Sequence, residues 1–319
     1  MKIDSFCHIV PKRYKAALEK ATGRSLYKGV TLLHDYEARI KEMESHGDLA
    51  QILTAGSIDE LENLTPIDAL MISQIVNEEM AELVSSYPEH FWGGIATIPL
   101  SDIDAAVKEI DRVVDQLGLK GLQITTTFRG ESIASEKFFP IYELMADLDL
   151  PVLFHPCNGP RAKPDMIFNW PMETTWMMID MSTSGVFEKY PDIKFMTHHC
   201  GAMIPTFANR VYISWFKNRF YPQTSDAKSP EDYFENIRKF YNDTALYGNS
   251  TAALEVGVDF FGVDHILFGT DFPLDGNRDP KGVGQTANTI DSINRMKLSE
   301  SEKQMIFEEN ARKLFKLKD

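Results

Sequence analysis

Four of the eight histidines in the chain close short apolar runs, and one aspartate directly follows another such run. These residues are His8, His155, His198, His199 and Asp271. Two neutral imidazoles and one carboxylate suit Zn, Mn or Fe(II) and leave coordination positions open for water and substrate. The residue types therefore predict a catalytic metal centre, for which His8, His155 and Asp271 are the leading candidates.

Each of these three candidates also has a purely structural explanation. His8 lies in the apolar run IDSFCHIVP and could be a core histidine that bonds a backbone carbonyl, while His155 could be a hydrogen-bonding residue at the end of a strand. Asp271 could cap a turn or a helix, where Asp is common. Their shared placement at the ends of apolar runs favours the functional interpretation of all three.

His198 and His199 are adjacent, and neighbouring residues on a strand point to opposite faces. Only one of the two is therefore expected to face the interior of the protein. Imidazole titrates near neutral pH, so the inward-facing histidine is either a further ligand or a general acid or base. The other histidine is expected to be structural.

Other side chains near these runs are candidates for binding. The three cysteines (Cys7, Cys157 and Cys200) lie close to the histidines, but small residues after strands are common packing choices, so thiolate ligands are less favoured. Arg210 could bind a substrate carboxylate through two hydrogen bonds or be an ion-paired helix residue. An aromatic pocket and core packing explain three further side chains equally well: Trp170, Trp176 and Phe272.

Eight short runs rich in β-forming residues recur along the chain, and stretches with helical periodicity separate them. This alternation predicts parallel strands with crossover helices, and it favours a closed (β/α)8 TIM barrel over a large doubly wound sheet. Barrel enzymes hold their active sites at the carboxyl ends of the strands, which is where the candidate residues fall. The predicted strands are 2–9, 49–55, 92–98, 121–126, 152–155, 194–199, 240–244 and 265–270, and clear helical stretches are 34–45, 67–86, 102–117 and 135–148.

The remaining segments complete a single predicted domain over residues 1–319. Residues 285–296 are the predicted eighth barrel helix, and Ser299 with Glu302 forms a capping-box pattern that opens an extra carboxyl-terminal helix outside the barrel. The longest irregular segment, 157–171, follows the fifth strand. It is predicted to be a lid or a wall of the active site.

The bulk composition excludes several classes of function. Hydrophobic residues make up 43% of the chain and charged residues 25%, as in an ordinary globular protein with a large core. The formal net charge of -14 opposes binding to nucleic acid or to an anionic membrane. The sequence has no signal-peptide pattern and no apolar run long enough to span a membrane, so a cytoplasmic protein with reduced thiols is predicted.

The motifs and their order resemble those of amidohydrolase-related metal enzymes, a group that includes aminocarboxymuconate-semialdehyde, γ-resorcylate and 5-carboxyvanillate decarboxylases. The resemblance spans nearly the whole chain. It is carried by IDSFCHIVP, FWGGIATIPL, LGLKGLQI, LPVLFHP, GVFEKYPDIKFMTHHCGAMIP, ILFGTDFPL and IFEENARKLFKL. Each motif is moderately specific, and their order and spacing together are strongly so.

The resemblance implies His8, His155 and Asp271 as metal ligands, His199 as the residue beside the reactive centre, and Arg210 as a substrate contact. In this family the first strand usually carries His-x-His or Glu-x-His. This chain has Phe6 at the first position of that motif, and phenylalanine cannot bind a metal. A three-ligand site with solvent in the gap is then expected, and Phe6, Trp170 and Phe272 are expected to face the substrate.

The leading functional hypothesis is metal-dependent, non-oxidative decarboxylation of a hydroxylated aromatic or related unsaturated carboxylic acid. One divalent ion is expected, Zn first and Mn or Fe as alternatives, with Asp271 or His199 supplying the proton. A hydrolase acting on a lactone, amide or related bond would need the same residues. The replacement of a ligand by Phe6 also permits an inactive barrel that serves as a binding subunit. The resemblance alone implies a homodimer.

Overall fold

The computed structural model describes residues 1–157, 167–217, 229–246, 251–274 and 284–318. Parallel strands form its centre and neighbour one another in chain order. The ring closes because the Ser5 N–H donates to the Phe268 carbonyl at 2.8 Å. The strands are β1 (Lys2–Ile9), β2 (Leu49–Ala55), β3 (Phe91–Gly94) with β4 (Ala96–Thr97), β5 (Leu122–Thr125), β8 (Val152–His155), β9 (Phe195–Thr197), β10 (Tyr241–Asp243) and β11 (Ile266–Leu267).

All eight predicted strands are present, and the predicted (β/α)8 barrel is confirmed. The third strand is divided into β3 and β4 at Ile95, whose N–H still donates to the Leu53 carbonyl of β2 at 2.9 Å. The last strand begins late because Val263–His265 forms a 3-10 turn. A short antiparallel hairpin of β6 (Thr127–Phe128) and β7 (Glu131–Ser132) lies outside the barrel sheet.

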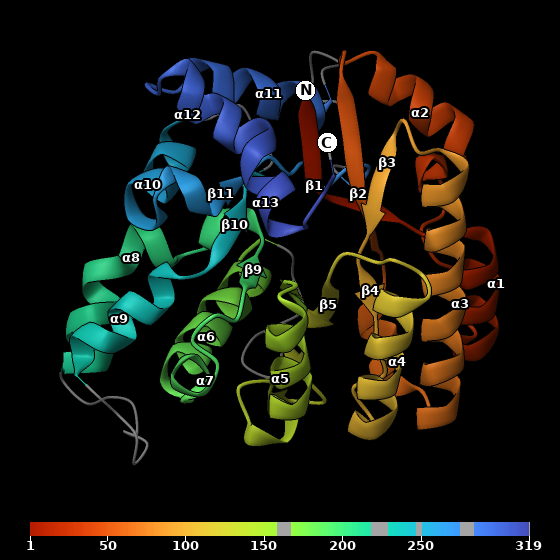
Figure 1. Cartoon of the computed structure of the whole chain (residues 1–319), viewed down its shortest axis with the longest axis horizontal. Helices are drawn as coiled ribbons and strands as arrows, with labels where there is room; N and C mark the ends of the chain where they lie inside the picture. Colours follow the sequence, from red (N-terminus) through yellow and green to blue (C-terminus); the bar gives the residue numbers. More distant parts are fainter. Residues whose placement is uncertain (158–166, 218–228, 247–250, 275–283, 319) are drawn as a thin grey trace.

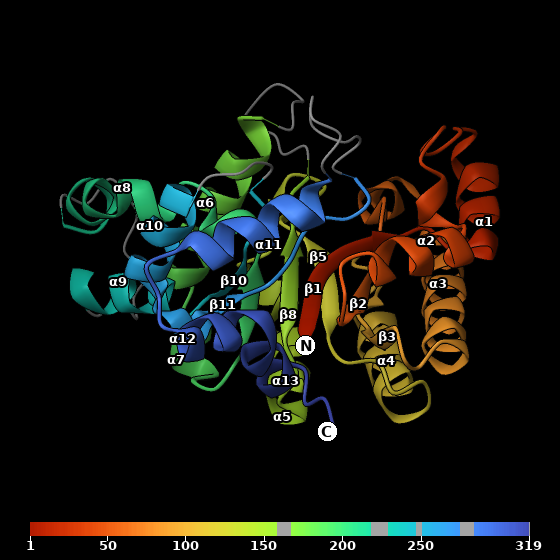
Figure 2. The same cartoon turned by 90° about the horizontal axis from the view of Figure 1, so that it is seen from above.

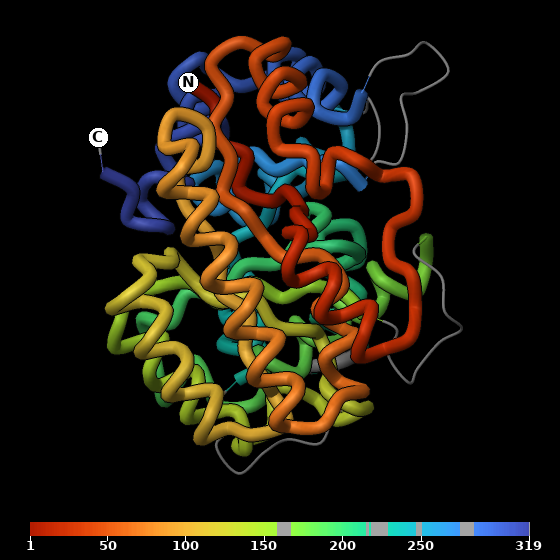
Figure 3. The backbone as a smooth tube through the Cα atoms, turned by 90° about the vertical axis from the view of Figure 1, so that its right-hand side faces the viewer, coloured from red at the N-terminus to blue at the C-terminus, as the bar shows by residue number. Residues whose placement is uncertain are grey.

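Helices surround the strands, as Figures 1 and 2 show. The starts of three of them follow from side-chain caps, because Asp35, Thr65 and Asp102 each accept a hydrogen bond from a backbone N–H three residues later. In Figure 3 the first helix lies beside the long third helix. The helices are α1 (Lys12–Thr22), α2 (Tyr36–Glu44), α3 (Pro66–Ser86), α4 (Ile103–Asp115), α5 (Phe139–Leu148), α6 (Asn169–Thr183), α7 (Val186–Lys189), α8 (Ile204–Val211), α9 (Pro230–Arg238), α10 (Thr251–Phe261) and α11 (Gln285–Arg295).

The carboxyl-terminal segment covers the amino-terminal end of the barrel. The predicted capping box of Ser299 and Glu302 is present and opens α12 (Glu300–Gln304), which continues through a π-helical turn (Met305–Glu309) into α13 (Asn310–Leu314). Ala311, Leu314 and Phe315 pack against residues inside the barrel: Ile3, Ile52, Ile95, Leu153, Met196 and Leu267. The predicted extra helix therefore lies outside the barrel, where its apolar face closes one mouth.

The interior changes character along the barrel axis. Its amino-terminal half is apolar, whereas buried polar side chains gather toward the carboxyl ends of the strands: His8, Thr54, His198, Asp243 and Asp271. No helix in the described residues is both long and apolar enough to cross a membrane. Most of the predicted lid or wall, residues 158–166, lies outside the described part of the chain.

Candidate metal centre

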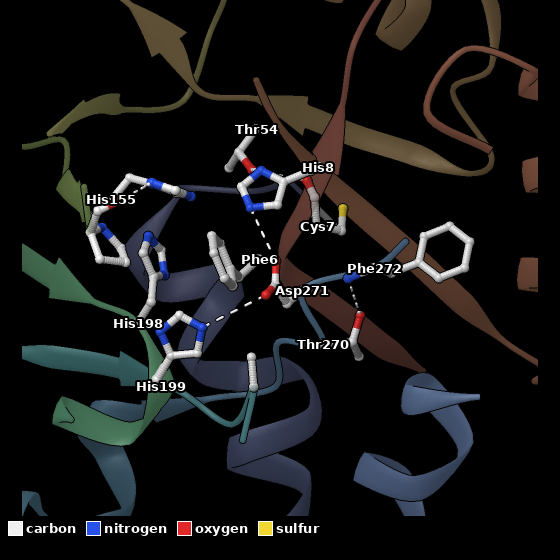
Figure 4. A network of polar contacts seen from close by, with 12 residues as sticks. Phe6, Cys7, His8, Thr54, His155, His198, His199, Thr270, Asp271 and Phe272 are labelled. Carbon is white, nitrogen blue, oxygen red and sulfur yellow. Dashed lines mark hydrogen bonds and ion pairs between the residues drawn. The ribbon is translucent and has the colours of Figure 1, made fainter. Parts of the chain in front are cut away.

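Four histidine rings surround the side chain of Phe6 at the carboxyl end of the barrel (Figure 4). The ring centroids of His8, His155, His198 and His199 lie 4.8, 6.2, 3.6 and 5.9 Å from that of Phe6. Asp271 joins the group through two contacts, 3.1 Å to His8 Nε2 and 3.7 Å to His199 Nε2. The structure thus brings the predicted ligands and the predicted catalytic residues together.

His8 directs its Nε2 toward Asp271. The Thr54 hydroxyl donates its hydrogen to the Cys7 carbonyl at 2.9 Å, so it can only accept from His8 Nδ1, which lies 3.1 Å away. This contact fixes the tautomer of His8 as an oxygen neighbour commonly does for metal-binding histidines. His8 Nε2 then lies 3.1 Å from Asp271 Oδ1, and either a bound cation or a proton on Nε2 can link the two atoms.

His155 is oriented in a similar way by the backbone. Its Nδ1 lies 2.7 Å from the Pro156 carbonyl, which can only accept, so Nε2 carries the lone pair. Burial and the neighbouring imidazoles hold the pKa of His155 well below its usual value, which keeps the ring neutral and able to bind a metal. The centroids of His8 and His155 are 5.1 Å apart. Two imidazoles bound at tetrahedral positions of one zinc ion would be about 5.2 Å apart.

The donor set therefore fits a divalent cation, with two imidazole nitrogens and one carboxylate. Within the described ranges, no three or more His, Cys, Asp or Glu side chains are already gathered tightly enough to hold a metal ion. The direct contact between His8 and Asp271 is consistent with this, since an ion bound by both would lie between the two atoms that now touch.

Asp271 and His199 form an ion pair beside His8 and His155. Burial acts to raise the pKa of Asp271, but the hydrogen bonds and charges of His199 and His8 outweigh it and hold that pKa well below its ordinary range. Burial acts to lower the pKa of His199, but its hydrogen bond and attraction to Asp271 raise it. The pair thus favours an ionised carboxylate next to a protonated imidazole.

Both His198 and His199 face the cluster, so the expectation that only one faces the interior is wrong. Strand β9 ends at Thr197, and the backbone then turns through positive φ angles of 58° at His199, 55° at Cys200 and 71° at Gly201. Strand alternation no longer applies beyond that point. Such a conformation is costly for residues other than glycine and is held here by its surroundings.

Asp243, at the end of β10, is the residue that holds this turn. Its Oδ1 accepts hydrogen bonds at 2.9 Å from the backbone N–H groups of His199 and Ala245, and its Oδ2 lies 2.6 Å from His198 Nδ1. Neither Asp243 nor Thr54 was among the predicted site residues. The signal for Asp243 was an acidic residue at the end of a predicted strand, whereas Thr54 had none.

Of the four residues predicted to contact the substrate, two lie at the histidine cluster and two do not. The Trp170 ring lies 5.7 Å from that of His155, and Phe6 is wholly buried at the centre of the cluster. The prediction that Phe272 faces the substrate is wrong. Its ring packs against the Arg39 guanidinium, 5.0 Å away, and points away from the histidines (Figure 4). Its neighbour Asp271 takes the inward direction, so Phe272 faces the opposite side. Arg210 is exposed in the last turn of α8, and no contact joins it to the cluster within the described residues.

The cysteines are packing residues. Cys7 Sγ donates to the Ile52 carbonyl, and Cys157 lies against Thr126 and Thr127. Cys200 packs against Gly257, and any side chain at position 257 would clash with its sulfur. Burial raises the pKa of each thiol. Thiolate ligands, already the less favoured prediction, are not supported by these positions.

The sequence model of the amidohydrolase family matches residues 3–317. The chain belongs to this family. The amidohydrolase is 26% identical to a 2-amino-3-carboxymuconate-6-semialdehyde decarboxylase of Dictyostelium discoideum, over 98% of this chain and 90% of the relative.

Two solved structures share the fold of this amidohydrolase. A 2,6-dihydroxybenzoate decarboxylase complexed with 2,6-dihydroxybenzoate superposes with a TM-score of 0.82 at 23% identity, covering 99% of this chain and 98% of that chain. A 5-carboxyvanillate decarboxylase from Novosphingobium aromaticivorans, complexed with manganese and 4-hydroxy-3-methoxy-5-nitrobenzoic acid, superposes with a TM-score of 0.83 at 22% identity. The latter match covers 99% of this chain and 96% of that chain.

Proposed function

We propose that this amidohydrolase is a metal-dependent, non-oxidative decarboxylase of a hydroxylated aromatic or related unsaturated carboxylic acid. The observation that carries the proposal is the convergence of His8, His155 and Asp271, with His199 paired to Asp271. The names of the similar proteins support the reaction class, since all three are decarboxylases of unsaturated or aromatic acids.

His8, His155 and Asp271 would hold the metal ion. We expect Zn²⁺ first, with Mn²⁺ or Fe²⁺ as alternatives, and the manganese in the 5-carboxyvanillate enzyme supports a divalent ion. Such an ion supplies a template and a Lewis acid for the carboxylate and neighbouring hydroxyl of a substrate. Thr54 and the Pro156 carbonyl keep the two imidazoles in the tautomers that binding requires.

His199 is the proton donor that we favour over Asp271. Its Nε2 is the nitrogen that faces Asp271 Oδ2, and the pairing favours the proton on the imidazole. In the proposed step this proton moves to the ring carbon that bears the carboxylate. The bond between that carbon and the carboxylate then breaks, its electron pair restores the aromatic ring, and carbon dioxide leaves.

Other parts of the proposal rest on residues outside the cluster. Trp170 is proposed to line the substrate site beside His155, and Phe6 to form its floor. Arg210 is proposed to bind a substrate carboxylate, although it is exposed in the described chain. A homodimer and a cytoplasmic location remain predictions from the sequence.

The proposal is tested with purified protein loaded with Mn²⁺ or Zn²⁺ and offered 2,6-dihydroxybenzoate and related hydroxybenzoates. Release of carbon dioxide without incorporation of oxygen from ¹⁸O-labelled water is expected, and it should be lost in His155→Ala. Appearance of ¹⁸O in a new carboxylate or alcohol of a lactone or amide substrate would instead make the protein a hydrolase. Failure to bind any divalent ion would support the inactive barrel.

A further inference from the structure

His198 is a buried histidine for which the proposed reaction has no role so far. Its side chain is fully buried and stacks on Phe6, with centroids 3.6 Å apart and an interplanar angle of 14°. Its Nδ1 lies 2.6 Å from Asp243 Oδ2. Asp243 Oδ1 already accepts from two backbone N–H groups, and a carboxylate oxygen is the natural acceptor of an imidazole N–H, so His198 Nδ1 carries the proton of this contact.

This proton placement leaves His198 Nε2 as an acceptor. Nε2 is buried and has no hydrogen-bond partner within the described part of the chain. A buried acceptor without a partner is unfavourable, so a donor or a cation is expected to meet it in the working protein. The rings of His155 and His199 lie 6.1 and 6.3 Å away, which places Nε2 at the cluster rather than in the outer core.

The spacing of the rings argues against His198 as a ligand of the same metal ion. Its centroid is 6.1 Å from that of His155, beyond the 5.1 Å that separates His155 from His8. Imidazoles on one tetrahedral ion would be about 5.2 Å apart. Figure 4 also shows the Phe6 ring standing between His198 and the contact of His8 with Asp271. A hydrogen-bond donor is therefore the partner that His198 Nε2 requires.

We propose that His198 is a substrate-binding residue whose Nε2 accepts a hydrogen bond from a second hydroxyl group on the aromatic ring. Asp243 sets its tautomer, and the stacked Phe6 sets its plane. The inference rests on the proposed function and narrows the substrate class to aromatic acids with a hydroxyl beyond the one next to the carboxylate. A site with a fixed acceptor discriminates against analogues that lack the donor.

The test measures binding rather than turnover. Mn²⁺-loaded wild type and His198→Phe are titrated calorimetrically with 2-hydroxybenzoate and with its 2,3-, 2,4-, 2,5- and 2,6-dihydroxy counterparts. Phenylalanine keeps an aromatic ring on Phe6 but has no acceptor. In the wild type, one dihydroxy isomer is expected to bind about five- to tenfold more tightly than 2-hydroxybenzoate, as one net hydrogen bond allows. In His198→Phe that preference should fall below twofold while 2-hydroxybenzoate binds as before.

Two further variants separate this role from a structural one. In Asp243→Asn the side-chain amide can donate as well as accept, so a proton on His198 Nδ1 is no longer required. This variant should reduce the preference for the dihydroxy isomer and change the ¹⁵N chemical-shift signature of the His198 tautomer. His90→Phe, at the opposite end of the barrel beside the start of β3, should change neither.

Each remaining outcome is decisive. A preference that survives in His198→Phe, or wild-type protein without any preference or any binding, would overturn the inference. A tenfold or greater loss of Mn²⁺ affinity in His198→Phe would make His198 a metal ligand instead. Wild-type binding with the expected preference but without carbon dioxide release would leave the inference standing and defeat the proposed decarboxylation.

Discussion

Thr54→Val is the sharpest test of how this amidohydrolase orients its proposed metal ligands. The substitution preserves the shape of a buried side chain and removes one hydroxyl, which accepts from His8 Nδ1 at 3.1 Å and donates to the Cys7 carbonyl at 2.9 Å. Without the hydroxyl, the buried Nδ1–H of His8 loses its partner. The alternative tautomer then becomes competitive, and it places a proton on the atom proposed to bind the metal.

The expected magnitude follows from these two hydrogen bonds. Loss of an oriented neighbour of a metal-binding histidine typically weakens metal affinity 10- to 100-fold, or about 1.4–2.7 kcal/mol. In the absence of metal, leaving the buried donor unpaired should lower the free energy of unfolding by roughly 1–3 kcal/mol. Mn²⁺ affinity is measured by calorimetry or chelator competition, and stability by urea unfolding in EDTA.

Thr97→Val is the matched control. Thr97 ends the neighbouring strand β4, is buried, and its hydroxyl has no hydrogen-bond partner among the described residues. Its replacement should leave Mn²⁺ affinity unchanged and should not reduce stability by more than about 0.5 kcal/mol. Mn²⁺ affinity in Thr54→Val within twofold of wild type would refute the proposed role of the hydroxyl.

Three other predictions concern the proposed metal ligands, the ion pair of Asp271 with His199, and the carboxyl-terminal segment that closes the amino-terminal mouth of the barrel. His155→Ala and Asp271→Ala should each abolish stoichiometric metal binding by elemental analysis, and an ion retained in both would contradict the ligand assignment. The raised pKa of His199 adds stability that is complete below its unfolded value of 6.5 and is lost as pH rises through the folded value. The lowered pKa of Asp271 adds stability present above 3.8 that is lost only in strong acid. In metal-free protein, His199→Gln should therefore cost more free energy of unfolding at pH 5.5 than at pH 9, and an equal cost would argue against the ion pair. Phe315→Ala should destabilise the fold by about 3–5 kcal/mol in urea unfolding but leave Mn²⁺ affinity unchanged once folded, whereas a large loss of affinity would show that the two ends of the barrel are coupled.

The barrel and the convergence of the distant candidates could be predicted from the sequence, because apolar runs that alternate with amphipathic stretches leave few other architectures. His8, His155 and Asp271 each end or follow such a run, and parallel strands bring their ends to one mouth. Phe6 was recognised as unable to bind a metal from its residue type alone.

The parts that could not be predicted depend on local backbone geometry and on long-range hydrogen bonds. The left-handed turn at His199 and Cys200 breaks the two-residue alternation, so the placement of His199 on the same side as His198 had no signal in the pattern. Phe272 was expected to face the substrate as part of an aromatic pocket, yet it points away from its neighbour Asp271 and its ring packs against Arg39. The contact between Thr54 and His8 joins different strands and leaves no local trace.

The plug formed by α12, the π turn and α13 has a practical consequence. The amino group of Met1 lies 3.8 Å from Glu308 in the π turn, so the start of β1 meets the carboxyl-terminal segment on the side of the barrel opposite the histidines. Affinity tags, surface tethers or fusion partners attached at either terminus will project away from the histidine-lined mouth. A circular permutant that joins the two termini through a linker is likewise expected to preserve the reactive end.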